Sequence, residues 1–128
     1  MYFAIGIAVR TREQLEEIHN LIINNYPNAK STDIKYRSRS AYSTIKLPFL
    51  RITILLMNTH GAQRYNVIYA PTDCTETEIW EYLMPMIIIA PNFKYLRSLD
   101  EIYKEFSLED NNVTFWSWNL CSYTKRNG

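Results

Sequence analysis

Residues 3–9, Phe-Ala-Ile-Gly-Ile-Ala-Val, carry the clearest structural signal in the chain. Large apolar side chains alternate with the small residues Ala4, Gly6 and Ala8, as in a strand buried on both faces. The face with small residues leaves room for a helix or another stretch of backbone to lie close. The pattern therefore predicts a buried first strand.

A helix follows this strand. Thr11 and Gln14 have the spacing of a capping box, in which a threonine side chain and a glutamine side chain each bind a backbone N–H. Apolar residues then recur at helical spacing from Leu15, and Pro27 ends the pattern because proline cannot continue a helix.

Further strands are predicted in the middle and at the end of the chain. Residues 33–47 alternate as a polar edge strand, bent near Ser40. Residues 49–57 and 64–70 predict a hairpin around an Asn-Thr-His-Gly turn signal. Residues 113–123 predict a last strand, in which Trp116 and Trp118 share a face. Two tryptophans on such a strand are most often part of the core, and if they face solvent instead they are expected to anchor an interface.

Two more helices are expected between these strands. Thr75 with Glu78, or Asp73 with Glu76, forms a second capping box, and Ser98 with Glu101 forms a third. The helix after the second box is expected to carry an apolar stripe of Ile79, Trp80, Leu83 and Met86, broken or kinked at Pro85.

These elements predict one α+β domain over residues 1–128. The expected fold is a mixed, mostly antiparallel sheet of about five strands in the order βαβββααβ, related to the ferredoxin-like fold, with helices on one face.

Composition excludes several classes of function. The chain has 128 residues, 47% of them hydrophobic and 21% charged, as in a globular domain. With only three glycines it can form neither a P-loop nor a dinucleotide-binding turn. Its longest apolar run, residues 84–90, is too short to cross a membrane.

The cysteines and histidines predict no metal site. Cys74 and Cys121 form no C-x-x-C pair, and His19 and His60 add no ligand spacing. We expect no metal and no cofactor. Unpaired cysteines and the lack of a leader segment predict a reducing, cytoplasmic location.

Residues 30–64 are strongly basic, with seven basic residues against one acid, Asp33. Lys35, Arg37 and Arg39 alternate, so in an extended strand they would project from one face about 7 Å apart. Basic residues interleaved with Tyr36 and Tyr42 suit a nucleic-acid surface. The alternative is that these charges protect an edge strand from pairing with other chains.

Residues 73–110 are acidic, with nine acids against three bases, although the whole chain has a net charge of +1. A dipolar domain of this kind suits a protein partner, because complementary charge steers encounter. The alternative is that these acids stabilise the N-termini of helices.

Two enzymatic alternatives are weaker. Cys74 near a helix start could act as a thiol nucleophile, with His60 as base and Asp73 as orienting group. A metal nuclease would need a carboxylate at the end of the first strand, where Arg10 stands. Other acids available to hold a cation are Glu76, Glu78 and Glu81.

The expected function is therefore that of a small non-enzymatic binding protein that occupies a host macromolecule, most simply a host protein. A DNA- or RNA-binding module is the alternative. Abundant Ile and Asn with sparse Ala and Gly are typical of AT-rich genomes, which favours a phage or mobile-element inhibitor. No membrane partner is expected. The expected partner-binding residues are Lys35, Tyr36, Arg37, Arg39, Tyr42, Arg51, Arg64, Trp116 and Trp118.

Overall fold

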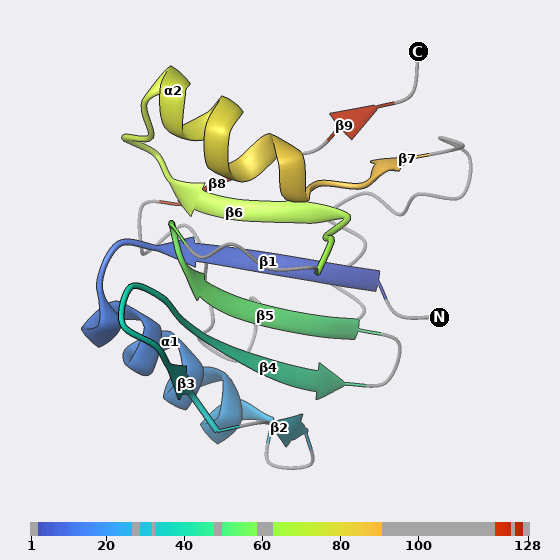
Figure 1. Ribbon diagram of the computed structural model, residues 1–128. Helices are drawn as coiled ribbons and strands as arrows, with labels where there is room; N and C mark the ends of the chain where they lie inside the picture. Colours follow the sequence, from blue (N-terminus) through green and yellow to red (C-terminus); the bar gives the residue numbers. More distant parts are fainter. Residues whose placement is uncertain are drawn as a thin grey trace.

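The computed structural model of the chain describes residues 3–26, 29–31, 33–47, 50–58, 63–90, 120–123 and 125–126. It is an α+β fold built on a mixed sheet with the strand order β2-β4-β5-β1-β6-β8, in which β3 also pairs with β4 (Figure 1). The strands of this sheet are β1 (Phe3–Val9), β2 (Lys30–Ser31), β3 (Lys35–Tyr36), β4 (Ala41–Leu47), β5 (Leu50–Leu56), β6 (Val67–Pro71) and β8 (Leu120–Tyr123).

Three further parts complete the described fold. Helix α1 (Arg12–Asn25) follows β1. Helix α2 (Glu76–Glu78) continues as a π-helical turn, η1 (Ile79–Leu83), and a 3-10 turn, η2 (Met84–Met86). Strands β7 (Ile89–Ala90) and β9 (Lys125–Arg126) pair in parallel as a small second sheet.

Strand β1 is buried on both faces, as its sequence predicts. It pairs in parallel with β5 along one edge and with β6 along the other. On one face Ile5, Ile7 and Val9 belong to the core that also holds Leu15, Ile18 and Ile22 of α1. On the other face Ala4 and Ala8 belong to a second core with Leu83 and Met86.

The prediction that the helices cover one face of the sheet is therefore wrong. Helix α1 packs on the face of the large β1 side chains, whereas the α2–η2 segment packs on the opposite, small-residue face. The mixed sheet is confirmed, but it has more strands than predicted, and the ferredoxin-like order is not confirmed.

The predicted hairpin of residues 49–57 with 64–70 is also wrong. Strands β5 and β6 run parallel to each other on opposite edges of β1, so the chain crosses from one edge of β1 to the other between them. Met57 N donates to Val9 O at one end of β1 (2.8 Å), and Asn66 N donates to Ala4 O at the other (2.9 Å). The Asn-Thr-His-Gly signal lies in the crossover between β5 and β6, and β5 forms a hairpin with β4 instead.

Residues 33–47 do not form one long strand. Strand β3 pairs antiparallel with the start of β4, with Lys35 opposite Tyr42 and Tyr36 opposite Ala41. Arg37 N donates to Ser40 O (2.8 Å), which closes a tight turn between the two strands. The bend expected near Ser40 is thus a full reversal of the chain.

The helix caps follow the sequence closely. Thr11 Oγ1 accepts a hydrogen bond from Gln14 N, although the Gln14 side chain accepts from Arg10 N and not from the cap residue. The capping box of Thr75 and Glu78 is complete. The Ser98–Glu101 box, Trp116 and Trp118 lie outside the described residues. None of the helices in the described ranges is long and apolar enough to span a membrane.

The close approach at Gly6 gives a stability test. A Cβ at Gly6 would lie 3.1 Å from two ring atoms of Tyr65 and 3.3 Å from Ile68 Cγ1. Gly6→Ala should therefore lower the free energy of unfolding by about 1–3 kcal/mol, measured by urea denaturation, because overpacking shifts well-packed neighbours. The cost should shrink when Gly6→Ala is made in a Tyr65→Ala background. An equal cost in both backgrounds would contradict this packing argument.

Candidate functional site

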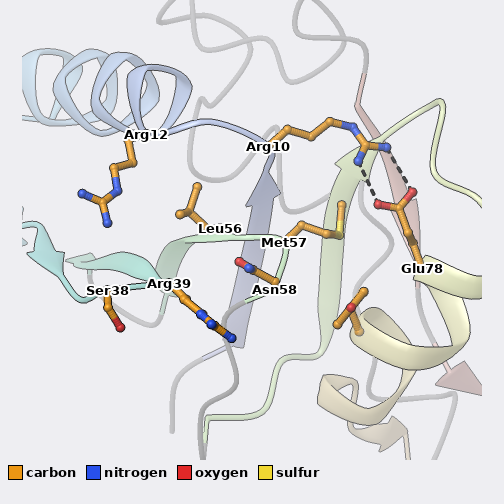
Figure 2. A pocket seen from close by; sticks show the side chains of 9 residues that line it. Arg10, Arg12, Ser38, Arg39, Leu56, Met57, Asn58 and Glu78 are labelled. Atoms are coloured by element: carbon orange, nitrogen blue, oxygen red, sulfur yellow. Dashed lines mark hydrogen bonds and ion pairs between the residues drawn. The ribbon is translucent and has the colours of Figure 1, made fainter.

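A pocket of about 410 Å³ lies outside the carboxyl ends of the parallel strands β1 and β5 (Figure 2). In open α/β sheets, ligands bind outside the carboxyl ends of neighbouring strands whose following segments pack on opposite faces of the sheet. Here β1 leads to α1 on one face, and β6 leads to α2 on the other. The pocket is lined by Arg10, Arg12, Ser38, Arg39, Leu56, Met57, Asn58, Glu78 and Tyr82.

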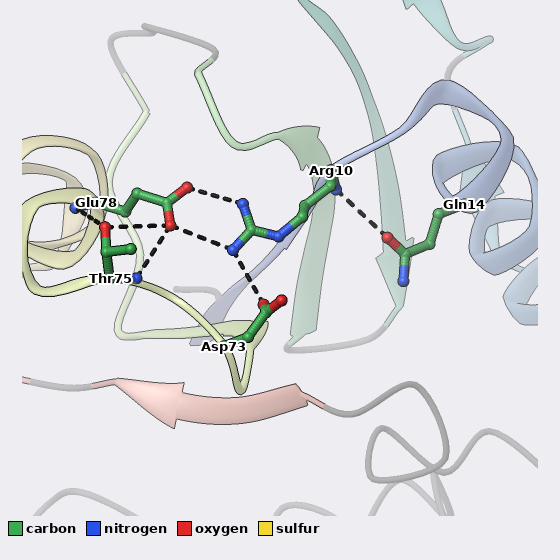
Figure 3. Close-up of polar contacts among 5 residues, drawn as sticks. All are labelled: Arg10, Gln14, Asp73, Thr75 and Glu78. Atoms are coloured by element: carbon green, nitrogen blue, oxygen red, sulfur yellow. Dashed lines mark hydrogen bonds and ion pairs between the residues drawn. The ribbon is translucent and has the colours of Figure 1, made fainter.

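An ion cluster joins the end of β1 to the start of α2 (Figure 3). Arg10 Nη1 donates to Glu78 Oε2 (2.8 Å), and Arg10 Nη2 donates to Asp73 Oδ1 (3.0 Å) and Glu78 Oε1 (3.2 Å). Glu78 Oε1 also accepts from the backbone N–H and the hydroxyl of Thr75. Both carboxylates are therefore engaged by a single guanidinium, and Glu78 is held by its own helix cap as well.

This cluster shifts the protonation equilibria of its members. The hydrogen bonds from Arg10, followed by that from the Thr75 backbone, lower the pKa of Glu78 from 4.5 to about 2. The same contacts, first with Glu78 and then with Asp73, raise the pKa of Arg10. Both ions remain charged over the whole physiological range.

A second arginine of the pocket is held from the α1 side. The Arg12 guanidinium lies 5.1 Å from the ring centroid of Tyr36, and its Nη2 donates to Arg37 O (2.7 Å). Tyr36 Oη donates to Glu16, and this hydrogen bond is the main reason that the pKa of Tyr36 is raised. Arg12 is thus fixed by ring stacking and a backbone carbonyl, with no carboxylate among the described residues bonded to it.

Arg39 is the third arginine of the pocket. It lies in the exposed Arg37–Ser40 turn, and no hydrogen bond or ion pair joins it to another described residue. The predicted row of Lys35, Arg37 and Arg39 does not form. Lys35 belongs to β3, whereas Arg37 and Arg39 lie in the turn that follows it. These three side chains therefore do not line up along one extended strand.

The other predicted basic residues gather elsewhere in the sheet. Lys46 lies directly opposite Lys30 on one side and Arg51 on the other, so the three form a cross-strand row. Arg51 Nη2 donates to Arg64 O (3.2 Å), which brings Arg64 beside this row. Like charges directly opposed across strands repel one another, so the charges of this row destabilise the sheet.

Trp80 does not share the burial of the apolar stripe that the sequence predicts. It is 65% exposed, whereas Leu83 and Met86 of the same stripe are buried. Ile79 packs against the second core, whereas Trp80, the next residue of the π-helical turn η1, faces away from it. The flanking exposed acids, Glu76 and Glu81, were the available signal for a surface position.

The remaining candidate residues do not form a reactive site. His19 Nδ1 and Ser43 Oγ lie 2.8 Å apart, but Ser43 is fully buried and burial lowers the pKa of His19. Cys74 packs partly buried against the second core, and His60 lies outside the described residues. Within the described ranges, no three His, Cys, Asp or Glu side chains are grouped to hold a metal ion. Tyr42 also packs against the second core.

The Glu78 ion pair predicts a pH dependence of stability. Because the folded pKa of Glu78 is about 2 against an ordinary 4.5, its contribution is complete above pH 4.5 and is lost as the pH falls toward 2. We expect the ion pair to contribute about 1 kcal/mol to the free energy of unfolding, since exposed ion pairs are screened by solvent. Urea denaturation of Glu78→Gln should show a smaller decline in stability over this pH window. Glu17→Gln on α1 is the control, and an unchanged decline in Glu78→Gln would contradict the assignment.

Comparisons with known proteins identify no relative of this chain. No family model matches it. No curated protein and no solved structure matches it either. Its function is therefore inferred from its own residues.

Proposed function

We propose that the chain is a non-enzymatic binding protein that acts by occupying another protein through a surface centred on Trp80. The observation that carries this proposal is the 65% exposure of Trp80 on a helical segment that is otherwise anchored in the second core. A large exposed aromatic side chain gains most from burial in a partner, and tryptophan is enriched among the residues that dominate binding energy.

The surroundings of Trp80 indicate the chemistry of its partner. Glu76, Thr77 and Glu81 are exposed on the neighbouring positions of the same segment. Neither Glu76 nor Glu81 takes part in the Arg10 cluster, in which Arg10 is paired with Glu78 and Asp73. The partner surface should therefore offer an apolar pocket for the indole ring, with basic residues at its rim.

The rigidity of the segment supports this role. The Arg10–Glu78 ion pair and the Thr75 cap fix its start, and Leu83 and Met86 bury its end. A side chain presented on a fixed element loses less entropy on binding than one on a loose segment. A host protein, with this chain as a phage or mobile-element inhibitor, remains the biological setting that the composition favours.

Trp80→Ala tests the proposal. The partner is first captured from a host lysate treated with nuclease, identified and purified. Trp80→Ala should then weaken its binding by at least about 2 kcal/mol, or roughly thirtyfold, in calorimetry, with little change in stability because Trp80 is exposed. Ile88→Ala, which trims another exposed apolar residue, is the control. Equal affinity of Trp80→Ala and wild type for the purified partner would exclude this surface.

A second candidate function, nucleic-acid binding, is favoured by the cross-strand row of Lys30, Lys46 and Arg51. Three like charges directly opposed in adjacent strands repel one another, and a polyanion would relieve that repulsion. Rows of this kind contact phosphates without reading sequence. The row is short and lies apart from the arginines of the pocket, so it suits a few phosphates and not a long duplex.

The salt dependence of binding tests this second candidate. If the row binds phosphates, the double variant Lys30→Gln/Lys46→Gln should lower the slope of log K against log salt for a single-stranded oligonucleotide by about 1.4. The same variant should be slightly more stable to urea, by a few tenths of a kcal/mol, because repulsion is removed. Lys35→Gln removes a charge outside the row as the control. A wild-type protein that binds no random oligonucleotide would rule this candidate out.

A further inference from the structure

We propose that the pocket at the carboxyl ends of β1 and β5 binds a small phosphate monoester, with its phosphate held between Arg12 and Arg39. This site is independent of the Trp80 surface and goes beyond the binding function proposed above. Figure 2 shows Arg12 on one side of the pocket with Ser38 and Arg39 below it, and the Arg10–Glu78 pair on the opposite side.

The two sides of the pocket differ in charge. On the α2 side, Arg10 is paired with both Glu78 and Asp73, so that side carries no free positive charge. On the other side, neither Arg12 nor Arg39 forms an ion pair with a described residue. An anion is therefore drawn to the side of Arg12 and Arg39 and is repelled from the side of the carboxylates.

The donors on the favoured side suit a phosphate. Arg12 is already oriented by the Tyr36 ring and by Arg37 O, and the rest of its N–H fork is available. Arginine binds phosphate oxygens in pairs, and a guanidinium fixed in advance loses little freedom on binding. Ser38 and Asn58 line the same pocket and add neutral donors.

The rest of the pocket sets the size and polarity of the ligand. Its volume of about 410 Å³ is that of a small-molecule site, and Leu56, Met57 and Tyr82 contribute apolar surface. A second phosphate on the ligand would face the Glu78–Asp73 side. The geometry therefore favours one phosphate on a compact apolar body over a diphosphate or a polyanion.

Phenyl phosphate is the probe that matches this description. Titrated into the full chain, it should bind saturably and more tightly than inorganic phosphate, because the ring adds contact with the apolar lining. Two arginines favour the dianion, so its affinity should rise as the pH passes about 6, where a phosphate monoester loses its second proton. Phenyl sulfate, which has one charge at every pH, should bind more weakly and without this rise.

Three variants locate the site. Arg12→Gln and Arg39→Gln should each lower the affinity for phenyl phosphate by about tenfold, the loss expected when one charged hydrogen-bonding partner is removed. Lys35→Gln removes an exposed positive charge from the adjacent strand, outside the pocket lining, and should change the affinity less than about twofold. Calorimetry and the ligand-dependent shift in unfolding temperature both report the binding.

Three outcomes would overturn the proposal. One is the absence of saturable binding at about 1 mM phenyl phosphate. Another is an equal loss in Lys35→Gln, which would reduce the effect to general charge. The third is a 5′-phosphorylated dinucleotide that binds more tightly than phenyl phosphate and loses affinity in the same two arginine variants, which would assign the phosphate to a nucleic-acid end. Because Trp80 is not part of the site, none of these results bears on the protein-binding proposal.

Discussion

The contact of Gly6 with the Tyr65 ring is the constraint on which the rest of this structure depends. Large side chains on both faces of β1 would keep the backbone of any neighbouring segment away from the strand. The small face of β1 lets the Tyr65 ring approach to within 3.1 Å of where a Cβ of Gly6 would stand, so the residues that lead into β6 can pack directly on the strand. The crossover makes β5 and β6 parallel neighbours of β1 and places β1 in the middle of the sheet.

The position of β1 in turn creates the edge where the charged residues meet. Because its two parallel neighbours end on the same side, Arg10, Met57 and Asp73 come from three separate parts of the chain to one edge. Arg10 sits where a metal nuclease on such a sheet would need a carboxylate, and it is paired with two carboxylates there. One half of the edge therefore carries a net negative charge and the other half a positive one, so the pocket favours an anion on its Arg12 and Arg39 side.

Local signals in the sequence predicted the parts of this fold that depend on local interactions. The alternation in residues 3–9 and the caps at Thr11 and Thr75 were visible because each involves neighbours in the chain. The crossover was missed because a turn signal shows that the chain reverses but not which strand it then joins. The Arg10–Glu78 pair spans 68 residues, and no spacing rule connects such residues. Of the expected site residues, Arg39 lines the pocket, Tyr36 orients Arg12, and Arg51 and Arg64 lie together. Trp80 was not among them, because the helical periodicity placed it in the apolar stripe.

The parallel pairing of β1 also has a consequence for how the chain acquires its structure. Phe3 pairs with Leu50 and Ile5 with Val67, so β1 has no partner until β5 has been made and no second partner until β6 has been made. At a synthesis rate of roughly 5–20 residues per second, this apolar strand stays unpaired on the ribosome for several seconds. The β4–β5 hairpin is local and can form first, offering β5 as a template onto which β1 docks. The first strand to be synthesised therefore depends for its burial on two strands that are made after it.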